Sequence, residues 1–187
     1  MTELRNTDFS DTNLKRITLP HGVSIKDGYA GGNGMGCFMN TKLDRIDLNG
    51  LTVIPVNCFL HSEVKEVIGI EYVTEIRTGQ MFGMEKIILP GIKILNGMFS
   101  DEKIVKYIEL GKQLEKIIGW SICVNAKSIE TFIIRATTPP ILENDKYPFN
   151  GTSFPIFVPD ESVNAYKSAT NWARLASRFK PISEYVE

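Results

Sequence analysis

The sequence predicts a mainly β protein: a right-handed solenoid of about six coils, closed by a short C-terminal α-helical cap. Three observations predict this fold. A short apolar motif recurs at a nearly constant step, and a second series of phenylalanines lies between its copies. The C-terminal part of the chain then abandons the motif for an apolar pattern of helical spacing.

The motif is apolar-x-x-apolar-x-apolar, and its last three positions alternate as in a strand with one buried face. It is clearest at residues 14–19, 43–48, 84–89 and 105–110, and looser at 64–69 and 129–134. Successive first positions are separated by 29, 21, 20, 21 and 24 residues, a period typical of leucine-rich repeats. We therefore expect Leu19, Leu48, Leu89 and Leu110 to line up in one apolar column.

The second series consists of Phe38, Phe59, Phe82 and Phe99, each preceded by Cys or Met. One repeat cannot bury its own apolar face, so the repeats must stack on one another and pair strand to strand. The long first step contains Gly31, Gly34 and further glycines within 28–36. We interpret this stretch as a loop inserted in the second coil.

We expect three regions: residues 1–13 as a polar tail or thin cap, 14–135 as the repeats, and 136–187 as a capping segment with a helix. Residues 154–159 predict a last edge strand bounded by prolines, and Asp160 lies at the expected helix cap. One helical face is predicted from apolar residues at intervals of three and four: Val163, Tyr166, Ala169, Trp172, Leu175, Ala176 and Phe179. Thr170-Asn171 could divide this helix into two.

Composition excludes several classes of partner. Lys and Arg total 21 against 22 Asp and Glu, with no basic run, so a nucleic-acid partner is not expected. No apolar stretch approaches the roughly 20 residues needed to cross a bilayer, which argues against membrane insertion. The amino terminus lacks the basic start and apolar core of a signal peptide.

Residues that often carry chemistry are few and poorly placed for it. His21 and His61 each stand beside a turn, and Cys37, Cys58 and Cys123 lack the spacing of a zinc site. Cys37 and Cys58 occupy equivalent places in adjacent coils, where they could fill an apolar slot or, in an oxidising compartment, form a disulfide. We expect no catalytic residue, cofactor or metal.

The adjacent acids at 101–102 and 160–161 suggest a loop and a helix cap rather than an acid-base pair. No Gly-Lys-Ser/Thr follows the glycine-rich stretch, which excludes a phosphate-binding P-loop.

The outward positions of the repeated strands predict a stripe on one sheet face. Tyr107 flanked by Ile88 and Ile133 would give an apolar centre with a charged rim, which is typical of protein-binding patches. The alternative is that charges paired across strands only keep the sheet soluble. The candidate partner-binding residues are Arg45, Asp47, Glu66, Lys86, Ile88, Tyr107, Glu109 and Ile133.

Residues 14–20, residues 84–90 and the pair Cys58-Phe59 resemble the BspA-like family of bacterial leucine-rich repeats. The stretches 136–140, 156–159 and 165–168 resemble the terminal segment of such proteins. The resemblance implies an exported or cell-surface protein that adheres to or binds other proteins. The sequence thus predicts a non-catalytic module that holds a protein or glycan partner, through the strand face or the glycine-rich loop. A structural spacer or assembly subunit is the alternative, and the oligomeric state stays open.

Overall fold

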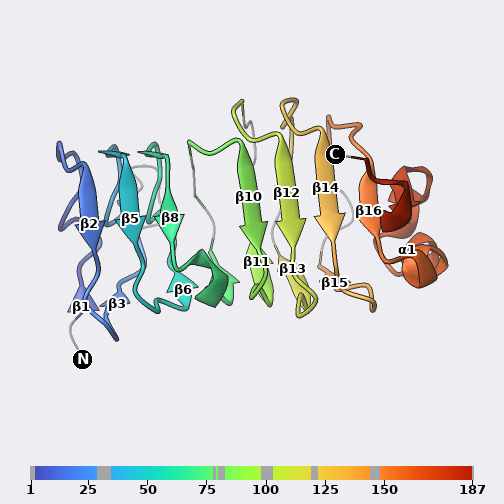
Figure 1. Ribbon diagram of the computed structural model, residues 1–187, viewed down its shortest axis with the longest axis horizontal. Helices are drawn as coiled ribbons and strands as arrows, with labels where there is room; N and C mark the ends of the chain where they lie inside the picture. The colour runs from blue at the N-terminus through green and yellow to red at the C-terminus, as the bar shows by residue number, and fades with distance from the viewer. Residues whose placement is uncertain are drawn as a thin grey trace.

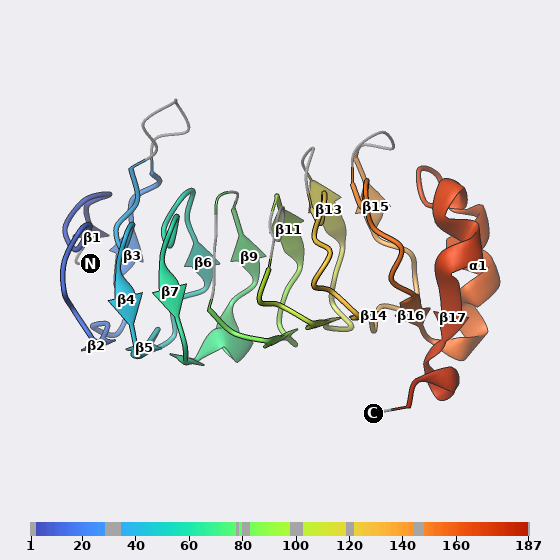
Figure 2. The ribbon, with the colours of Figure 1, turned by 90° about the horizontal axis from the view of Figure 1, so that it is seen from above.

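The computed structural model describes residues 3–28, 35–77, 79, 83–97, 103–118, 122–143 and 148–186. This part of the chain is mainly β, with parallel sheets and one short α-helix, consistent with a repeat fold (Figure 1). Short strands lie in two rows on opposite sides of the molecule, here called the front row and the back row (Figure 2). The apolar core lies between them.

Each repeat adds one strand to each row. The front row contains β2 (Arg16–Thr18), β5 (Arg45–Asp47), β8 (Val67–Ile68), β10 (Lys86–Leu89), β12 (Tyr107–Leu110), β14 (Thr131–Ile134) and β16 (Ile156–Val158). The back row contains β3 (Ser24–Ile25), β6 (Val53–Ile54), β9 (Glu75–Ile76), β11 (Ile94–Asn96), β13 (Lys116–Ile118) and β15 (Ile141–Leu142). A further pair, β4 (Lys42–Leu43) and β7 (Glu63–Val64), lies between the rows.

Within each sheet, neighbouring strands of a row pair in parallel at the register that the motif predicts, while β3 and β6 of the back row belong to separate sheets. Ile87 of β10 lies opposite Ile108 of β12. The four leucines expected in one apolar column, Leu19, Leu48, Leu89 and Leu110, are at most 1% exposed and belong to one core cluster. Strand pairing places Leu89 directly beside Leu110.

The front row is broken between β8 and β10, which do not pair (Figure 1). The expectation of evenly layered strands is wrong at this point. Gly69 stands where other repeats place the last apolar residue of the motif, and it adopts a left-handed conformation with φ of 80°. It ends β8 after two residues and precedes a 3₁₀ turn, η1 (Ile70–Tyr72). The weakest copy of the motif therefore marks the break.

The turns that follow Phe9, Phe38, Phe59 and Phe149 obey a local rule. The residue two positions later has a positive φ: Asp11, Asn40, His61 and Gly151, with φ of 58°, 55°, 56° and 70°. The residue three positions later carries a hydroxyl that donates to the phenylalanine carbonyl in repeats such as Phe38–Thr41, at 2.7 Å, and Phe149–Thr152, at 2.6 Å. Phe38 and Phe59 stack with ring centroids 5.5 Å apart. Phe82 and Phe99 lie outside the described residues.

The C-terminal cap differs from the single helix that the spacing favours. Helix α1 (Val163–Ser168) ends before Thr170, and the 3₁₀ segment η3 (Ala173–Arg178) follows it, so the divided helix is the correct alternative. Phe179 was expected on the helix but begins strand β17 (Phe179–Pro181). Because β17 pairs with β16, β16 is an inner strand and not the predicted edge.

Asp160 does not cap α1. It begins the 3₁₀ turn η2 (Asp160–Ser162), and its carboxylate accepts a hydrogen bond from the backbone N–H of Ser183 at 3.1 Å. Ser183 belongs to the last 3₁₀ turn, η4 (Ile182–Glu184).

Buried side chains of the cap satisfy backbone carbonyls at the end of the repeats. The Tyr166 hydroxyl donates to the Ala136 carbonyl at 2.8 Å, and the Trp172 indole N–H donates to the Pro140 carbonyl at 2.8 Å. Both side chains are fully buried. Since an unpartnered carbonyl in an apolar interior is costly, these bonds help to hold the cap on the repeats, in addition to its apolar contacts.

The amino-terminal segment packs against the first repeats. Strand β1 (Glu3–Leu4) pairs in parallel with β3, and Phe9 stacks on Phe38 at 5.2 Å. Residues 3–13 therefore resemble the second half of a repeat, the part that contains the back-row strand and the stacked phenylalanine.

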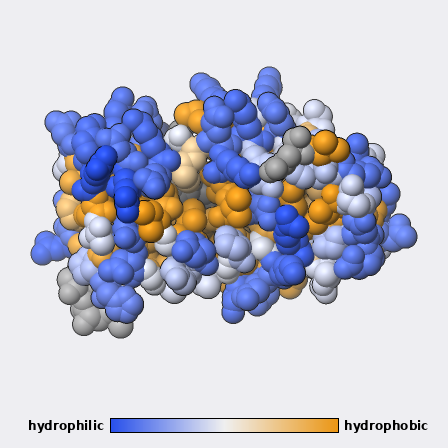
Figure 3. Space-filling model, in the orientation of Figure 1, coloured by the Kyte–Doolittle hydropathy of each residue, from blue (hydrophilic) through white to orange (hydrophobic). Residues whose placement is uncertain are grey.

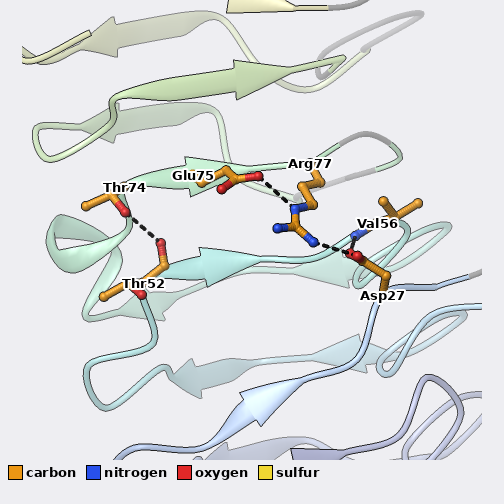
Figure 4. A network of polar contacts seen from close by, with 6 residues as sticks. All are labelled: Asp27, Thr52, Val56, Thr74, Glu75 and Arg77. Carbon is orange, nitrogen blue, oxygen red and sulfur yellow. Dashed lines mark hydrogen bonds and ion pairs between the residues drawn. The ribbon is translucent and has the colours of Figure 1, made fainter. Parts of the chain in front are cut away.

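A polar network ties together three successive repeats (Figure 4). Arg77 contacts Asp27 at 2.5 Å and Glu75 at 2.7 Å, and Asp27 accepts a hydrogen bond from the N–H of Val56 at 3.0 Å. Asp27 immediately precedes the glycine-rich insertion, so the network anchors one end of it. Residues 29–34 of the insertion lie outside the described residues.

Candidate functional site

The front row carries all eight candidate residues on its outer face, but the break divides them into two groups. Arg45, Asp47 and Glu66 lie on or beside β5 and β8. The other five lie on β10, β12 and β14: Lys86, Ile88, Tyr107, Glu109 and Ile133. Figure 3 shows this face with apolar surface between hydrophilic clusters.

The second group contains a connected polar network. The Tyr107 hydroxyl donates to Glu109 Oε2 at 2.5 Å, and Arg135 Nε donates to Glu109 Oε1 at 2.6 Å. Lys86 Nζ lies 4.5 Å from the centroid of the Tyr107 ring, within cation–π range. Tyr185 packs against the same ring at 6.0 Å. We call Lys86, Tyr107, Glu109, Arg135 and Tyr185 the front-face cluster.

Electrostatics keep Glu109 ionised and Tyr107 protonated. Burial alone would raise the pKa of Glu109, but hydrogen bonds from Arg135 and Tyr107 outweigh burial and hold that pKa below its ordinary value. Burial and then the bond to Glu109 raise the pKa of the Tyr107 phenol. Near neutral pH the Tyr107 hydroxyl is therefore a fixed hydrogen-bond donor and the Glu109 carboxylate a fixed acceptor.

The C-terminal segment covers part of this face. The Tyr185 ring contacts Tyr107 of β12 and Phe157 of β16, whose ring centroid lies 5.3 Å away. Because β14 lies between β12 and β16, Tyr185 must cross the outer side of β14. The expectation that Ile133 is an open apolar contact is wrong, since its side chain is 0% exposed although it lies outside the core cluster.

Ile88 remains the accessible apolar residue of the group, with 39% of its surface exposed. It lies opposite Glu109 in the β10–β12 register. An apolar side chain is thus available to a partner beside fixed charges.

The first group is less organised. Arg45 Nε lies 4.0 Å from Glu66 Oε2, and both side chains are about half exposed, so this ion pair contributes little to stability. The Asp47 carboxylate accepts a hydrogen bond from the Asn49 N–H at 2.9 Å. This bond stabilises the turn that follows β5.

The cysteines and histidines considered as possible chemical groups lie in the core and in turns, respectively. Cys37, Cys58 and Cys123 carry buried free thiols, and burial raises the pKa of Cys37 to about 12. His21 and His61 are exposed in turns. Among the described residues, no three His, Cys, Asp or Glu side chains gather in a group that could hold a metal. Residues 101–102 lie outside the described part.

Two members of the front-face cluster were not predicted. Arg135 follows β14 and continues the outward alternation from Thr131 and Ile133, so extending that alternation by one step would have found it. Nothing comparable in the sequence indicates Tyr185, because its position depends on how β17 returns along β16.

Comparison with known proteins agrees with the repeat architecture. In the part of the chain that the structure describes, no helix is long and apolar enough to span a membrane. A search of curated proteins finds no match. The model of the BspA type leucine-rich repeat region matches residues 1–87 and 33–154, with six copies. These matches cover most of the chain, which therefore belongs to the BspA-type leucine-rich repeat family.

Proposed function

We propose that this chain is a non-catalytic interaction module that holds a protein partner on its front face, at Ile88 and the front-face cluster. Leucine-rich repeats serve in general as protein-interaction modules. The proposal includes the finer architecture: a right-handed solenoid over residues 14–135, with a tail or thin cap at 1–13 and a capping segment at 136–187. An adhesive role and a glycan partner belong to the same proposal.

The observation that carries the proposal is the combination of rigidity and accessibility in the cluster. Tyr107, Glu109 and Arg135 hold one another in fixed positions, so a partner would not have to order them on binding. Ile88 is exposed beside them. An apolar contact next to pre-ordered polar groups is the composition of many binding hot spots.

Site-specific crosslinking tests the proposal. A photoreactive amino acid is placed at Ile88 on the front row and, in a matched control, at Ile141 on the back row, which is 65% exposed. We expect one partner to crosslink from position 88 and not from 141, and its purified form to bind less tightly, by about tenfold or more, when Tyr107→Ala is introduced. Equal crosslinking from both positions would contradict the proposal.

A structural spacer or assembly subunit is the second candidate. The tightly fitted cap, with buried Tyr166 and Trp172, supports it because it gives the repeats a rigid end. Light scattering of the purified protein separates the two ideas. Concentration-dependent assembly, together with the absence of any crosslinked partner at position 88, would favour the spacer.

A further inference from the structure

In the described part of the chain, strand β2 lies at the end of its sheet and one of its edges is unpaired, here called the open edge. The sheet order is β2-β5-β8, so among the described residues β2 pairs with β5 on one edge and with no strand on the other. Residues 3–13 supply a back-row strand, β1, and stack Phe9 on Phe38. In the described part of the chain they supply no front-row strand, so the position beside β2 is unfilled there (Figure 1).

The backbone groups at this open edge follow from the pairing of β5. Arg45 N donates to Lys15 O at 3.2 Å and Leu19 N donates to Asp47 O at 2.9 Å, whereas Ile46 N donates toward β8, to Glu66 O, at 2.9 Å. In β5, the backbone groups of residues whose side chains face outward therefore bond to the preceding repeat. The backbone groups of residues whose side chains face inward bond to the following repeat. By this alternation, the N–H and C=O of Arg16 and Thr18 point to the open edge.

The side chains beside that edge select for an acidic partner. Arg16 lies directly opposite Arg45, and two like charges at this spacing are unfavourable. Glu66 balances Arg45 on its other side. Among the described residues Arg16 makes no ion pair, and the carboxylate near it, Asp44, is bound by Lys65 at 2.9 Å. A shallow hollow lies at this place, lined by Arg16, Ile17, Thr18 and Arg45.

The inward side requires an apolar residue. Ile17 is half-buried, whereas its counterparts in the next repeats with a neighbour on both sides, such as Ile46 and Ile108, have no exposed surface. An apolar side chain placed next to Ile17 would complete its burial, at about 25 cal/mol for each Å² removed from water.

We propose that the open edge of β2 binds an extended segment of a partner polypeptide as a parallel added strand, with a carboxylate beside Arg16 and an apolar residue beside Ile17. This mode gives affinity through main-chain hydrogen bonds and specificity through alternate side chains. The site is distinct from the front-face cluster, which lies on the other side of the break between β8 and β10.

The chain itself supplies the probe. Residues 62–69, Ser-Glu-Val-Lys-Glu-Val-Ile-Gly, contain the segment that already places Glu66 beside Arg45 and Val67 beside Ile46. A labelled peptide of this sequence is titrated against the whole protein by fluorescence anisotropy. We expect saturable binding, and we expect Arg16→Glu to weaken it by about fivefold or more. A peptide that carries Glu66→Lys should instead bind more tightly to the Arg16→Glu protein than to the wild-type protein.

Backbone variants distinguish strand addition from simple charge attraction. In the proposed register the N–H of Val67 in the peptide donates to the protein, whereas the N–H of Glu66 points away. N-methylation at Val67 should therefore weaken binding by about tenfold and N-methylation at Glu66 far less. In the protein, Thr18→Pro should abolish binding while Thr18→Val retains it, because the strand alternation points the N–H of Thr18 to the open edge and proline is tolerated at sheet edges.

Two results would overturn the proposal. One is peptide binding that is indifferent to Thr18→Pro and to the site of N-methylation, which would indicate charge attraction only. The other is absence of peptide binding together with self-association that Thr18→Pro removes, since the occupant would then be a second copy of this chain. Neither result depends on a partner at Ile88.

Discussion

Three glycines differ in what a side chain would meet, and their alanine variants test the packing of the repeats. A Cβ on Gly36 would lie 1.7 Å from the carbonyl oxygen of Asn57 in the next repeat. A Cβ on Gly22 would meet nothing within 4 Å, but the backbone there has φ of 70°. A Cβ on Gly83 would find its nearest atoms at 3.5 Å, an ordinary contact, without a positive φ.

The expected magnitudes follow from these distances. For Gly36→Ala, the backbones must separate until the 1.7 Å approach becomes at least 3.4 Å. Such overpacking costs about 1 to 3 kcal/mol or more, and it strains the neighbouring bond from Met39 N to Gly36 O at 3.0 Å. We expect a loss of about 3 kcal/mol. Gly22→Ala should cost about 1 kcal/mol through its left-handed backbone alone, and Gly83→Ala should be neutral or stabilise by about 0.5 kcal/mol.

Urea unfolding followed by far-ultraviolet circular dichroism measures these differences, with the slope of each transition checked for a change in cooperativity. The ranking matters more than any single value. If Gly36→Ala destabilised no more than Gly22→Ala, the close approach of the insertion's end to Asn57 would be refuted.

The remaining predictions concern buried polar groups. Tyr166→Phe removes only the hydroxyl that donates to Ala136, so it should cost about 1 to 3 kcal/mol in urea unfolding; a cost near zero would show that the cap is held by apolar contact alone. Glu109 has a folded-state pKa below its ordinary value of 4.5, so its contribution is present above that value and is lost as the pH falls through the folded pKa. The stability gap between wild type and Glu109→Gln should therefore shrink as the pH falls below the ordinary value of 4.5, and a constant gap would contradict this. Because burial raises the pKa values of Cys37 and Cys58, both thiols should react with a disulfide reagent only at the rate of unfolding; immediate labelling of the folded protein would refute their burial.

The repeats were predictable because each depends on a local pattern. The motif sets which residues face inward, and stacking at a nearly constant step buries them against the next repeat. Leu19, Leu48, Leu89 and Leu110 are buried in the core as expected. Even the break after β8 coincides with the copy in which Gly69 replaces the last apolar residue. Burial of one face is sufficient to encode such elements in the sequence.

The ends and the candidate site were predicted less well, because they depend on contacts between distant segments. Helical spacing from Val163 to Phe179 matches one face, yet Thr170-Asn171 divide the segment and Phe179 pairs with β16 instead. The alternation of β14 places Ile133 outward but cannot show that Tyr185 covers its strand.

The repeat, its family and the buried inward residues can be read from the order of apolar residues along the chain. Which outward residues stay accessible becomes visible only in the folded protein: Ile88 is exposed, Ile133 is covered, and in the described part of the chain one edge of β2 is unpaired. These differ because a strand's inward face is set by its own alternation. Its outward face and its free edge are set by whichever other segment packs against them.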